Sequence, residues 1–599
     1  MADNAADRQS EAASAANWQP RRIAAWASAA VCVTAIGLLV ITVRVIQLKI
    51  APGERLQSVM EDPFSTRTSV GRRGDIVDRR GRLLATTKIG WRAFVDPHET
   101  QDLSTIGVQL QQLIGIDAVE TARKVDSRRH SRFVPVSDIL EDWQVDRILS
   151  ADLDGVGLER RQVRAYPYGE TASRLVGKVG FDHDGLGGLE HALDEQLQGS
   201  PGSVRYLRDV KRRPLWVESH GYQPHDDGDA IQLSLDLEIQ RFVESRLELA
   251  VQDCNAGGGR AIVVNPHSGE ILALADIINP REGWPGQPED ELRETDERLG
   301  RNRCVSDPYE PGSTFKPFVW SVATEAGDAQ PEEVLPTPAA VPYRTASGRR
   351  IRDVHYYGPM SWRRVLVKSL NSGMAIVAER MTTHSMQSVV KRFGFGQRTG
   401  CGIAGETAGL VTTASKWSSY SQVSVSMGHE IAVTPLQMVR GFSAFARDGS
   451  LPSLNLISGM DIAPVVQQAI TPETALLTRE IMEEVMTDGT GQASQSEHYR
   501  LFGKSGTAQL PRVEGGGYHE DRYISSFIAG APFDTPRIVV LCVIDDPDRN
   551  LGAWYGGRVA GPVVRDLIDF TLNYMQVPPD KLDEQQSTAM AHAARRSNP

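Results

Sequence analysis

Hydrophobic and polar positions change character several times along this chain of 599 residues. Residues 23–43 form a continuous apolar run without a charged side chain, flanked by Arg21, Arg22 and Arg44. At about 1.5 Å per helical residue, a run of this length crosses a hydrocarbon core of about 30 Å. We therefore predict one uncleaved membrane-spanning helix. The alternative is a signal peptide, but the run is longer than a usual signal core and lacks a convincing cleavage site.

The remaining pattern predicts an α+β fold. Residues 44–228 contain short strand-like runs with many Gly and Arg residues, which favours an elongated β-rich pedestal. An amphipathic helix is then expected at 237–251, followed by a β-hairpin whose strands lie at 260–265 and 270–275. Such an order is typical of an antiparallel sheet flanked by helices. Further helices are predicted at 315–326, 362–369, 373–381, 472–487 and 562–575, and strands at 502–510, 525–531 and 538–544.

The chain thus divides into five parts. We predict a disordered cytoplasmic tail at 1–22, a transmembrane helix at 23–43, a dimerisation-like pedestal domain at 44–228, a catalytic domain at 229–576 and a disordered tail at 577–599. Charge at the two ends of the apolar run is nearly equal, so the positive-inside rule does not fix its orientation.

Composition excludes several classes of protein. The formal net charge of −11 argues against a duplex nucleic acid partner. Five cysteines without C-x-x-C spacing predict neither a zinc site nor a disulfide framework. A His-Glu pair at 429–430 does not continue as H-E-x-x-H, because position 433 is valine. We therefore expect no metal and no cofactor.

Three short motifs supply candidate chemistry. They are S-x-x-K at Ser313 and Lys316, S-L-N at Ser369 and Asn371, and K-S-G-T at 504–507. A serine hydroxyl needs an adjacent base to become a nucleophile, and a lysine three residues along a helix lies on the same face. Lys316 accepts a proton only if burial and a nearby positive charge, here Lys504, lower its pKa. The motifs predict a serine acyl-transfer site.

Two local features accompany these motifs. Pro311 and Gly312 predict a turn that leads into a helix N-terminus at the serine, where backbone N–H groups are free. Gly506 is expected to let a substrate approach the backbone of its strand closely. Both features suit an oxyanion hole, in which backbone N–H groups stabilise a developing negative charge.

In its motifs and their surroundings the chain resembles the class B penicillin-binding proteins, the monofunctional peptidoglycan D,D-transpeptidases. The nucleophile box Y-E-P-G-S-T-F-K-P lies at 309–317, and an N-terminal box, R-G-D-I-V-D-R-R-G-R-L-L-A, lies at 73–85. The resemblance covers roughly residues 40–570. Two positions depart from the family pattern: Glu430 replaces a more usual glycine, and Asn265 replaces an aspartate. The loop at Glu430 either does not need a positive φ or has changed its role.

This resemblance implies a role for each site residue. Ser313 is the expected nucleophile, Lys316 its base, Ser369 a proton relay to the leaving amine, Asn371 a partner for the donor peptide and Lys504 a positive group that positions the relay. Ser505, Gly506 and Thr507 are expected to bind the terminal carboxylate of D-Ala-D-Ala or of a β-lactam. The oxyanion hole would consist of the backbone N–H groups of Ser313 and Thr507. Glu406 is expected to fix a loop.

The resemblance implies a D,D-transpeptidase of the bacterial cytoplasmic (inner) membrane. We expect the chain to cross that membrane once, with the bulk of the protein on the periplasmic or extracellular side. A β-lactamase, a penicillin sensor and a non-catalytic scaffold remain as alternatives, but we find no deacylating glutamate loop, no signalling domain and no damaged motif. Asn371 and the E-P-G context favour cell division over elongation, whereas K-S-G-T-A-Q leans the other way. The expected partners are stem peptides, β-lactams, a polytopic lipid II polymerase of the shape, elongation, division and sporulation family, and other division-complex membrane proteins.

Overall fold

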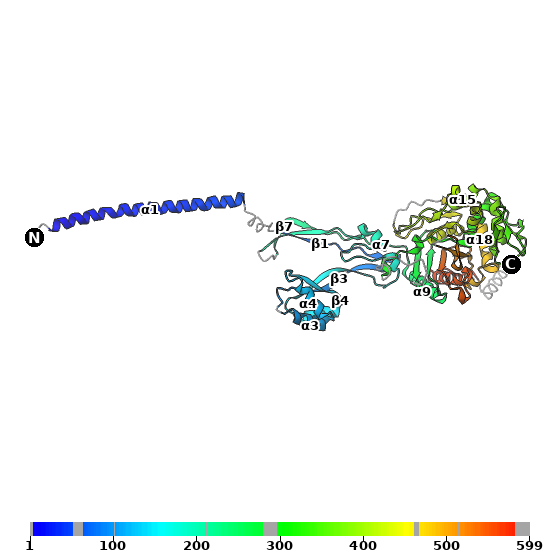
Figure 1. The fold of residues 1–599 in the computed structure, drawn as a ribbon, viewed down its shortest axis with the longest axis horizontal. Helices are drawn as coiled ribbons and strands as arrows, with labels where there is room; N and C mark the ends of the chain where they lie inside the picture. Colours follow the sequence, from blue (N-terminus) through cyan, green and yellow to red (C-terminus); the bar gives the residue numbers. More distant parts are fainter. Residues whose placement is uncertain are drawn as a thin grey trace, which may run out of the picture. The chain divides into compact units, whose positions relative to one another are not determined.

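The computed structural model describes residues 4–51, 64–100, 102–209, 214–279, 296–459, 467–512 and 516–581 (Figure 1). Contacts divide the chain into two compact units. One consists of Met1–Val70 and Pro201–His225, and the other of Gly71–Ser200 and Asp226–Pro599.

The first unit contains the long helix α1 (Asn4–Ile50) and a small sheet. Within α1, the stretch Arg21–Ile50 has a mean hydropathy of 2.4 and is long and apolar enough to cross a membrane. This includes the predicted span. The helix begins at Asn4, however, so the prediction of a disordered tail up to residue 22 differs from the structure. Ala, Glu, Gln and Arg dominate this segment, and all four are strong helix formers.

The sheet of the first unit is antiparallel, in the order β1-β6-β7. Its strands are β1 (Phe64–Ser69), β6 (Gly202–Arg208) and β7 (Pro214–Gln223). Strands β1 and β7 therefore form its edges. The β-rich character predicted for the pedestal holds in this part of the chain.

The second unit begins with a mixed sheet in which β3 pairs with β2, β4 and β5. The strands are β2 (Ile76–Val77), β3 (Leu83–Val95), β4 (Val134–Leu140), β5 (Val156–Ala165) and β8 (Ile231–Gln232). Three helices that the sequence analysis did not predict pack against it: α3 (Leu103–Ile114), α4 (Ala118–Asp126) and α5 (Asp142–Ala151) (Figure 1). Ile106, Leu110 and Ile148 from these helices share a core with Val95 and Val134.

Buried ion pairs hold the N-terminal box in place. The fully buried Glu190 accepts hydrogen bonds from Arg73 Nε and Arg164 Nε, each at 2.7 Å. Glu190 lies in α7 (Gly188–Ala192), which precedes α8 (Asp194–Leu197). All three side chains are buried, so water does not solvate their charges, and the opposite charges stabilise one another instead.

The same box connects to the catalytic part of the second unit. Asp78 accepts from the backbone N–H of Leu237 at 3.1 Å and is paired with Arg82. Arg82 Nη2 also donates at 2.6 Å to Asp236, the residue that caps α9 (Leu237–Asp253). The box recognised in the sequence therefore fixes the start of the first catalytic helix.

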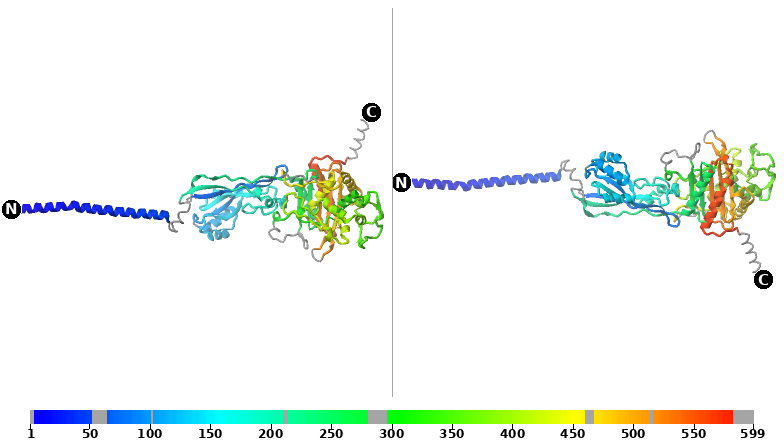
Figure 2. Two further views of the ribbon diagram at one scale, coloured as in Figure 1. Left: turned by 90° about the horizontal axis from the view of Figure 1, so that it is seen from above. Right: turned by 90° about the horizontal axis from the view of Figure 1, so that it is seen from below.

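An antiparallel sheet in the order β10-β9-β21-β20-β19 forms the centre of the catalytic part. Its strands are β9 (Gly258–Val264), β10 (Ile271–Ile278), β19 (Phe502–Pro511), β20 (Tyr518–Ala531) and β21 (Ile538–Asp545). Strand β21 lies beside β9 although they are far apart in the sequence (Figure 2). The hairpin and the C-terminal strands were predicted, and the α+β fold class is confirmed.

Separate cores cover the two faces of this sheet. Ala261 and Val263 pack with α9 and with the last helix, α20 (Gly561–Tyr574). The alternate residues Ile262 and Val264 belong to the larger core, which includes α12 (Lys316–Ala326), α17 (Pro435–Phe442) and α18 (Pro472–Asp488). This alternation follows from the period of two in a strand.

Shorter elements complete the second unit. The helices are α6 (Ser173–Val176), η1 (Glu297–Leu299), α11 (Arg303–Ser306), η2 (Gly312–Phe315), α13 (Trp362–Lys368), α14 (Asn371–Arg380), α15 (Thr383–Arg392), η3 (Ala414–Lys416), α16 (Ser421–Ser426), η4 (Ser443–Ala446), η5 (Gln492–Ser494), η6 (Arg549–Leu551) and α19 (Gly556–Val559). Two-residue strands pair as β11 (Val334–Leu335) with β14 (Met360–Ser361), β12 (Tyr343–Arg344) with β13 (Arg350–Ile351), β15 (Leu410–Val411) with β16 (Ile431–Ala432), and β17 (Ser450–Leu451) with β18 (Gln467–Gln468).

The ordered domain extends a few residues past 576, the end that the sequence predicts for it. Val577 O accepts a hydrogen bond from Tyr499 at 2.7 Å, and the Lys581 N–H donates to His498 O at 3.0 Å. Residues 577–581 are therefore held against the domain, in contrast to the predicted disorder. The remainder of the predicted tail, 582–599, lies outside the described residues.

Replacing the buried carboxylate tests the ion-pair cluster. Glu190→Gln leaves the buried guanidinium group of Arg164 without its ion-pair partner and leaves Arg73 paired with Asp194 alone, so we expect the free energy of unfolding to fall by about 3–5 kcal/mol. Urea unfolding of the full-length protein in detergent measures this. Asp126→Asn is the control, because its pair with Arg129 is exposed and should matter by less than about 0.5 kcal/mol. Equal effects of the two substitutions would contradict the assignment.

Candidate active site

The nucleophile motif lies on a tight turn rather than inside an α-helix. Ser313 belongs to the 3-10 turn η2, and α12 begins only at Lys316. A 3-10 turn has about three residues per turn, so Ser313 and Lys316 lie on one side of it. Gly312 before the serine has a φ of +55° and donates its N–H to Gly428 O at 3.0 Å. The predicted turn is thus present, but the serine itself lies in a 3-10 turn and not in the first turn of an α-helix.

Lys316 is completely buried and meets the second motif. Its Nζ donates to Ser369 O at 2.7 Å and to Asn371 Oδ1 at 2.7 Å, and it lies 3.3 Å from Ser369 Oγ. Asn371 Nδ2 donates to Arg352 O at 2.9 Å. Both ends of the Asn371 amide are therefore engaged within the protein, and its contact with a donor peptide stays a prediction.

Lys504 reaches the same hydroxyl from the edge strand β19. Its Nζ donates to Ser369 Oγ at 2.9 Å and to Ser505 O at 3.0 Å. The Ser369 hydroxyl thus accepts from two lysines, which leaves its own hydrogen available for donation. Residues from three distant motifs meet at one oxygen atom.

Burial changes the titration of both lysines. Desolvation lowers the pKa of Lys316 to about 7, against the opposing charge of Asp353. Desolvation also lowers the pKa of Lys504 well below its ordinary value, and the charge of Lys316 adds to this effect. Burial thus acts on Lys316 as expected, but the like charge acts in the other direction: the Lys316 charge lowers the pKa of Lys504, and Lys504 is not among the causes of the Lys316 shift. Neutral Lys316 is accordingly accessible near neutral pH.

The second motif depends on an unusual backbone conformation and on one aspartate. Ser369 ends α13 with a φ of +58°, a left-handed value that is uncommon for serine. Asp353 Oδ1 accepts from the first N–H groups of α14, those of Asn371 at 2.5 Å and Ser372 at 3.0 Å. This carboxylate fixes the helix start from which Asn371 points to Lys316. Asp353 lies in no motif, so the sequence analysis missed it.

The third motif packs closely on the nucleophile turn. A Cβ at Gly506 would lie 2.8 Å from Pro311 O and 2.9 Å from Thr314 Cγ2. The glycine therefore admits the nucleophile segment, and its part in substrate approach stays a prediction. Ser505 Oγ lies 2.7 Å from Thr490 Oγ1, and Thr507 Oγ1 accepts from the N–H of Gly556 at 3.0 Å.

Around Glu310, three residues before Ser313, lies a polar cluster of Glu310, His429, Glu430 and Tyr518. Glu310 accepts from His429 Nδ1 at 2.9 Å, from the Glu430 N–H at 3.0 Å and from the Tyr518 hydroxyl at 2.9 Å. Burial and the Glu310 charge raise the pKa of Tyr518. Glu430 has a φ of +58°, so the alternative that this loop does not need a positive φ is wrong. The other alternative, a changed role, remains.

One loop residue behaves as expected. Glu406 accepts from the N–H groups of Thr399 at 2.6 Å and Gly400 at 3.1 Å, which is the loop-fixing role predicted for it. The cysteines among the described residues are free.

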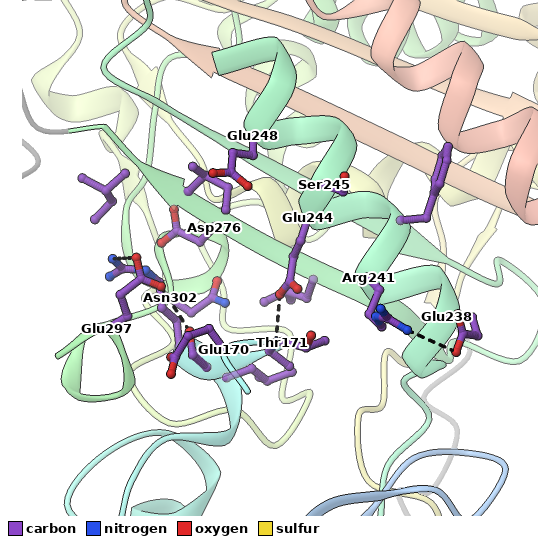
Figure 3. A pocket seen from close by; sticks show the side chains of 18 of the residues that line it. Glu170, Thr171, Glu238, Arg241, Glu244, Ser245, Glu248, Asp276, Glu297 and Asn302 are labelled. Carbon is purple, nitrogen blue, oxygen red and sulfur yellow. Dashed lines mark hydrogen bonds and ion pairs between the residues drawn. The ribbon is translucent and has the colours of Figure 1, made fainter. Parts of the chain in front are cut away.

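A separate acidic cavity of about 790 Å³ lies among α6, α9, β10 and η1, and none of the predicted site residues lines it (Figure 3). Glu244 from α9 points into it with its carboxylate toward the Thr171 segment, where the Ala172 N–H donates to it at 2.9 Å. Burial raises the pKa of Glu244 to about 7, and the charges of Glu297 and Glu248 act in the same direction.

Comparison with known proteins agrees with this geometry. The family model of the penicillin-binding protein transpeptidase domain matches residues 259–569, and that of the penicillin-binding protein dimerisation domain matches residues 68–233. The chain belongs to the class B penicillin-binding proteins. The family inferred from the motifs is therefore confirmed.

Several members of this family are similar over most of their length. Stage V sporulation protein D of Bacillus subtilis is 30% identical over 562 residues, covering 91% of this chain and 85% of that protein. Peptidoglycan D,D-transpeptidase FtsI of Escherichia coli K12 is 31% identical over 517 residues, covering 85% of each. The structure of penicillin-binding protein 3 from Mycobacterium tuberculosis, complexed with aztreonam, matches with a TM-score of 0.64 at 25% identity, over 86% of this chain and 98% of that one.

Proposed function

We propose that this penicillin-binding protein is a serine-type peptidoglycan D,D-transpeptidase, which cross-links stem peptides through an acyl-enzyme on Ser313 and is acylated there by β-lactams. The observation that carries the proposal is the meeting of Lys316 Nζ and Lys504 Nζ at Ser369 Oγ, beside the turn that presents Ser313. The match to the transpeptidase family model supports the same reaction.

In the first step, Ser313 Oγ attacks the carbonyl carbon of the penultimate D-alanine and transfers its proton to neutral Lys316. The peptide bond to the terminal D-alanine breaks, and Ser369 passes its proton to the leaving amine and takes the proton held by Lys316 in its place. Ser369 suits this relay because its oxygen accepts from both lysines. An acceptor amine then attacks the ester, a new peptide bond forms, and Ser313 regains its proton.

Other groups of the site bind the donor. We assign the oxyanion hole to the backbone N–H groups of Ser313 and Thr507, because η2 packs directly on β19. Ser505 and Thr507 bind the terminal carboxylate, and Gly506 allows the close packing that brings the two segments together. Asn371 holds Lys316 in place and contacts the donor peptide.

Labelled penicillin should form a long-lived ester with Ser313, since no group is assigned to activate a deacylating water. Mass spectrometry of digested full-length protein identifies the labelled residue, and Ser313→Ala is the control that should remain unlabelled. An impermeant labelled penicillin should also react in cells whose outer barrier is opened, because we place the catalytic domain outside the cytoplasmic membrane. Label on another residue, or rapid turnover of the drug, would refute the transpeptidase assignment.

Acylation should depend on the protonation of Lys316. With a pKa of about 7, the neutral base becomes more abundant as pH rises, so the second-order acylation rate constant should increase from pH 6 to pH 8 and then level off. Lys316→Ala should lower the rate by about 10²–10⁴-fold and abolish this pH dependence. Stopped-flow measurements with a fluorescent penicillin across this pH range provide the test. A wild-type rate in Lys316→Ala would show that another group is the base.

We further propose the following placement of the chain. Residues 23–43 span the inner membrane once, 44–228 form the pedestal, and 229–576 form the transpeptidase domain outside the cytoplasm. The apolar stretch of α1 supports the anchor.

Septal wall synthesis is the process we assign to this enzyme, with the elongation branch as the alternative. Asn371, the E-P-G context and the similarity to FtsI support division. A polytopic lipid II polymerase of the shape, elongation, division and sporulation family would supply glycan strands and contact the pedestal and the membrane helix. Other division-complex membrane proteins would bind beside it.

Depletion in the native organism distinguishes the two branches. Loss of a septal transpeptidase should give filamentous cells with blocked septa, because cross-linking at the division site stops while the side wall continues to grow. Microscopy of depleted cells, with re-expression of the wild type and of Ser313→Ala, provides the readout. Rounded or widened cells that still divide would favour elongation.

A further inference from the structure

Glu430 is held in a strained conformation beside the nucleophile turn. Its φ of +58° is costly for a side chain other than glycine, and such conformations persist where surrounding contacts enforce them. Here Ser421 Oγ donates to Glu430 Oε2 at 2.5 Å, and the Glu430 N–H donates to Glu310. The chain thus maintains a carboxylate at a position where glycine would relieve the strain.

The hydrogen bonds within this cluster leave one carboxylate oxygen available to a ligand. Donors from His429, Tyr518 and the backbone of Glu430 already satisfy the Glu310 carboxylate. A carboxylate only accepts, so His429 Nδ1 carries the hydrogen of its contact with Glu310. Glu430 is exposed, and within the described part of the chain no hydrogen bond is recorded to its Oε1. Oε1 of Glu430 is therefore an available acceptor.

The cluster lies where the residue before the D-alanines should be. If the donor carboxylate binds Ser505 and the scissile carbonyl binds the Thr507 N–H, the peptide continues along the edge strand β19 toward Gln509 and Pro511. Pro511 is paired with Tyr518, whose hydroxyl contacts Glu310. The residue that precedes the D-alanines in a stem peptide is a diamino acid, whose side chain ends in an amine.

We propose that Glu430 binds the ammonium group of this diamino acid side chain and so selects donors with a free amine. The inference rests on the proposed transpeptidase function. A primary ammonium carries three donors and a positive charge, which match a carboxylate acceptor. An acetylated amine retains one donor and loses the charge.

Two penicillins that differ only at the end of the acyl side chain test this selection, one ending in a primary ammonium and the other in the same amine acetylated. The acyl side chain of a penicillin stands where the diamino acid joins the D-alanines. We expect full-length wild-type protein to be acylated about tenfold faster by the ammonium compound, equivalent to about 1.4 kcal/mol. Raising the salt concentration should reduce this preference.

Glu430→Gln should reduce the preference to within about twofold, because glutamine keeps the shape and the contact with Ser421 but lacks the charge. Glu497→Gln, a change at an exposed glutamate between α18 and β19, should leave both rates unchanged. Equal rates for the two penicillins in the wild type, or an unchanged preference in Glu430→Gln, would overturn the proposal. Failure of both compounds to acylate Ser313 would instead refute the transpeptidase function, and this inference with it.

Discussion

The site depends on the burial of two lysine side chains around one hydroxyl group. Burying an ammonium group is costly unless hydrogen bonds replace its water, and two such groups also repel each other. Lys316 finds acceptors in Ser369 and Asn371, and Lys504 in Ser369 and the Ser505 carbonyl. These contacts keep the lysines in place while burial favours their neutral forms. The chemistry we propose follows from this arrangement, because a lysine that is already easy to deprotonate can serve as a base.

Such an arrangement demands a rigid framework on every side. Lys504 is carried by β19 of a five-stranded sheet with a core on each face, and Lys316 begins a helix of the larger core. The S-L-N motif depends on more strained elements. Ser369 adopts a left-handed conformation at the end of α13, and Asp353 holds the first turn of α14. Strain of this kind is stored where the surrounding structure determines the conformation, and it commonly marks functional sites.

Charged contacts in the N-terminal box extend this framework to the mixed sheet around β3. Arg73 and Arg164 share the buried Glu190, while Arg82 joins Asp78 to the cap of α9. The N-terminal box, which is far in sequence from the three catalytic motifs, therefore determines how α9 begins. Each of these groups is buried or partly buried, and the removal of Glu190 would leave the buried charge of Arg164 without its ion-pair partner.

The sequence by itself determined the elements and the chemistry of the motifs. The apolar runs and turn residues predicted β9, β10 and the C-terminal strands, the amphipathic pattern predicted α9, and α18 was predicted as well, because such patterns reflect burial on one or both faces. Resemblance to a family supplied the roles of Ser313, Lys316 and Lys504. Tertiary structure decided what local patterns do not encode: the role of Asp353, the packing of Gly506 against Pro311, the helices α3, α4 and α5 of the pedestal, and the left-handed conformations of Ser369 and Glu430. These features arise from contacts between segments far apart in the chain, whose energies appear only when the segments are brought together.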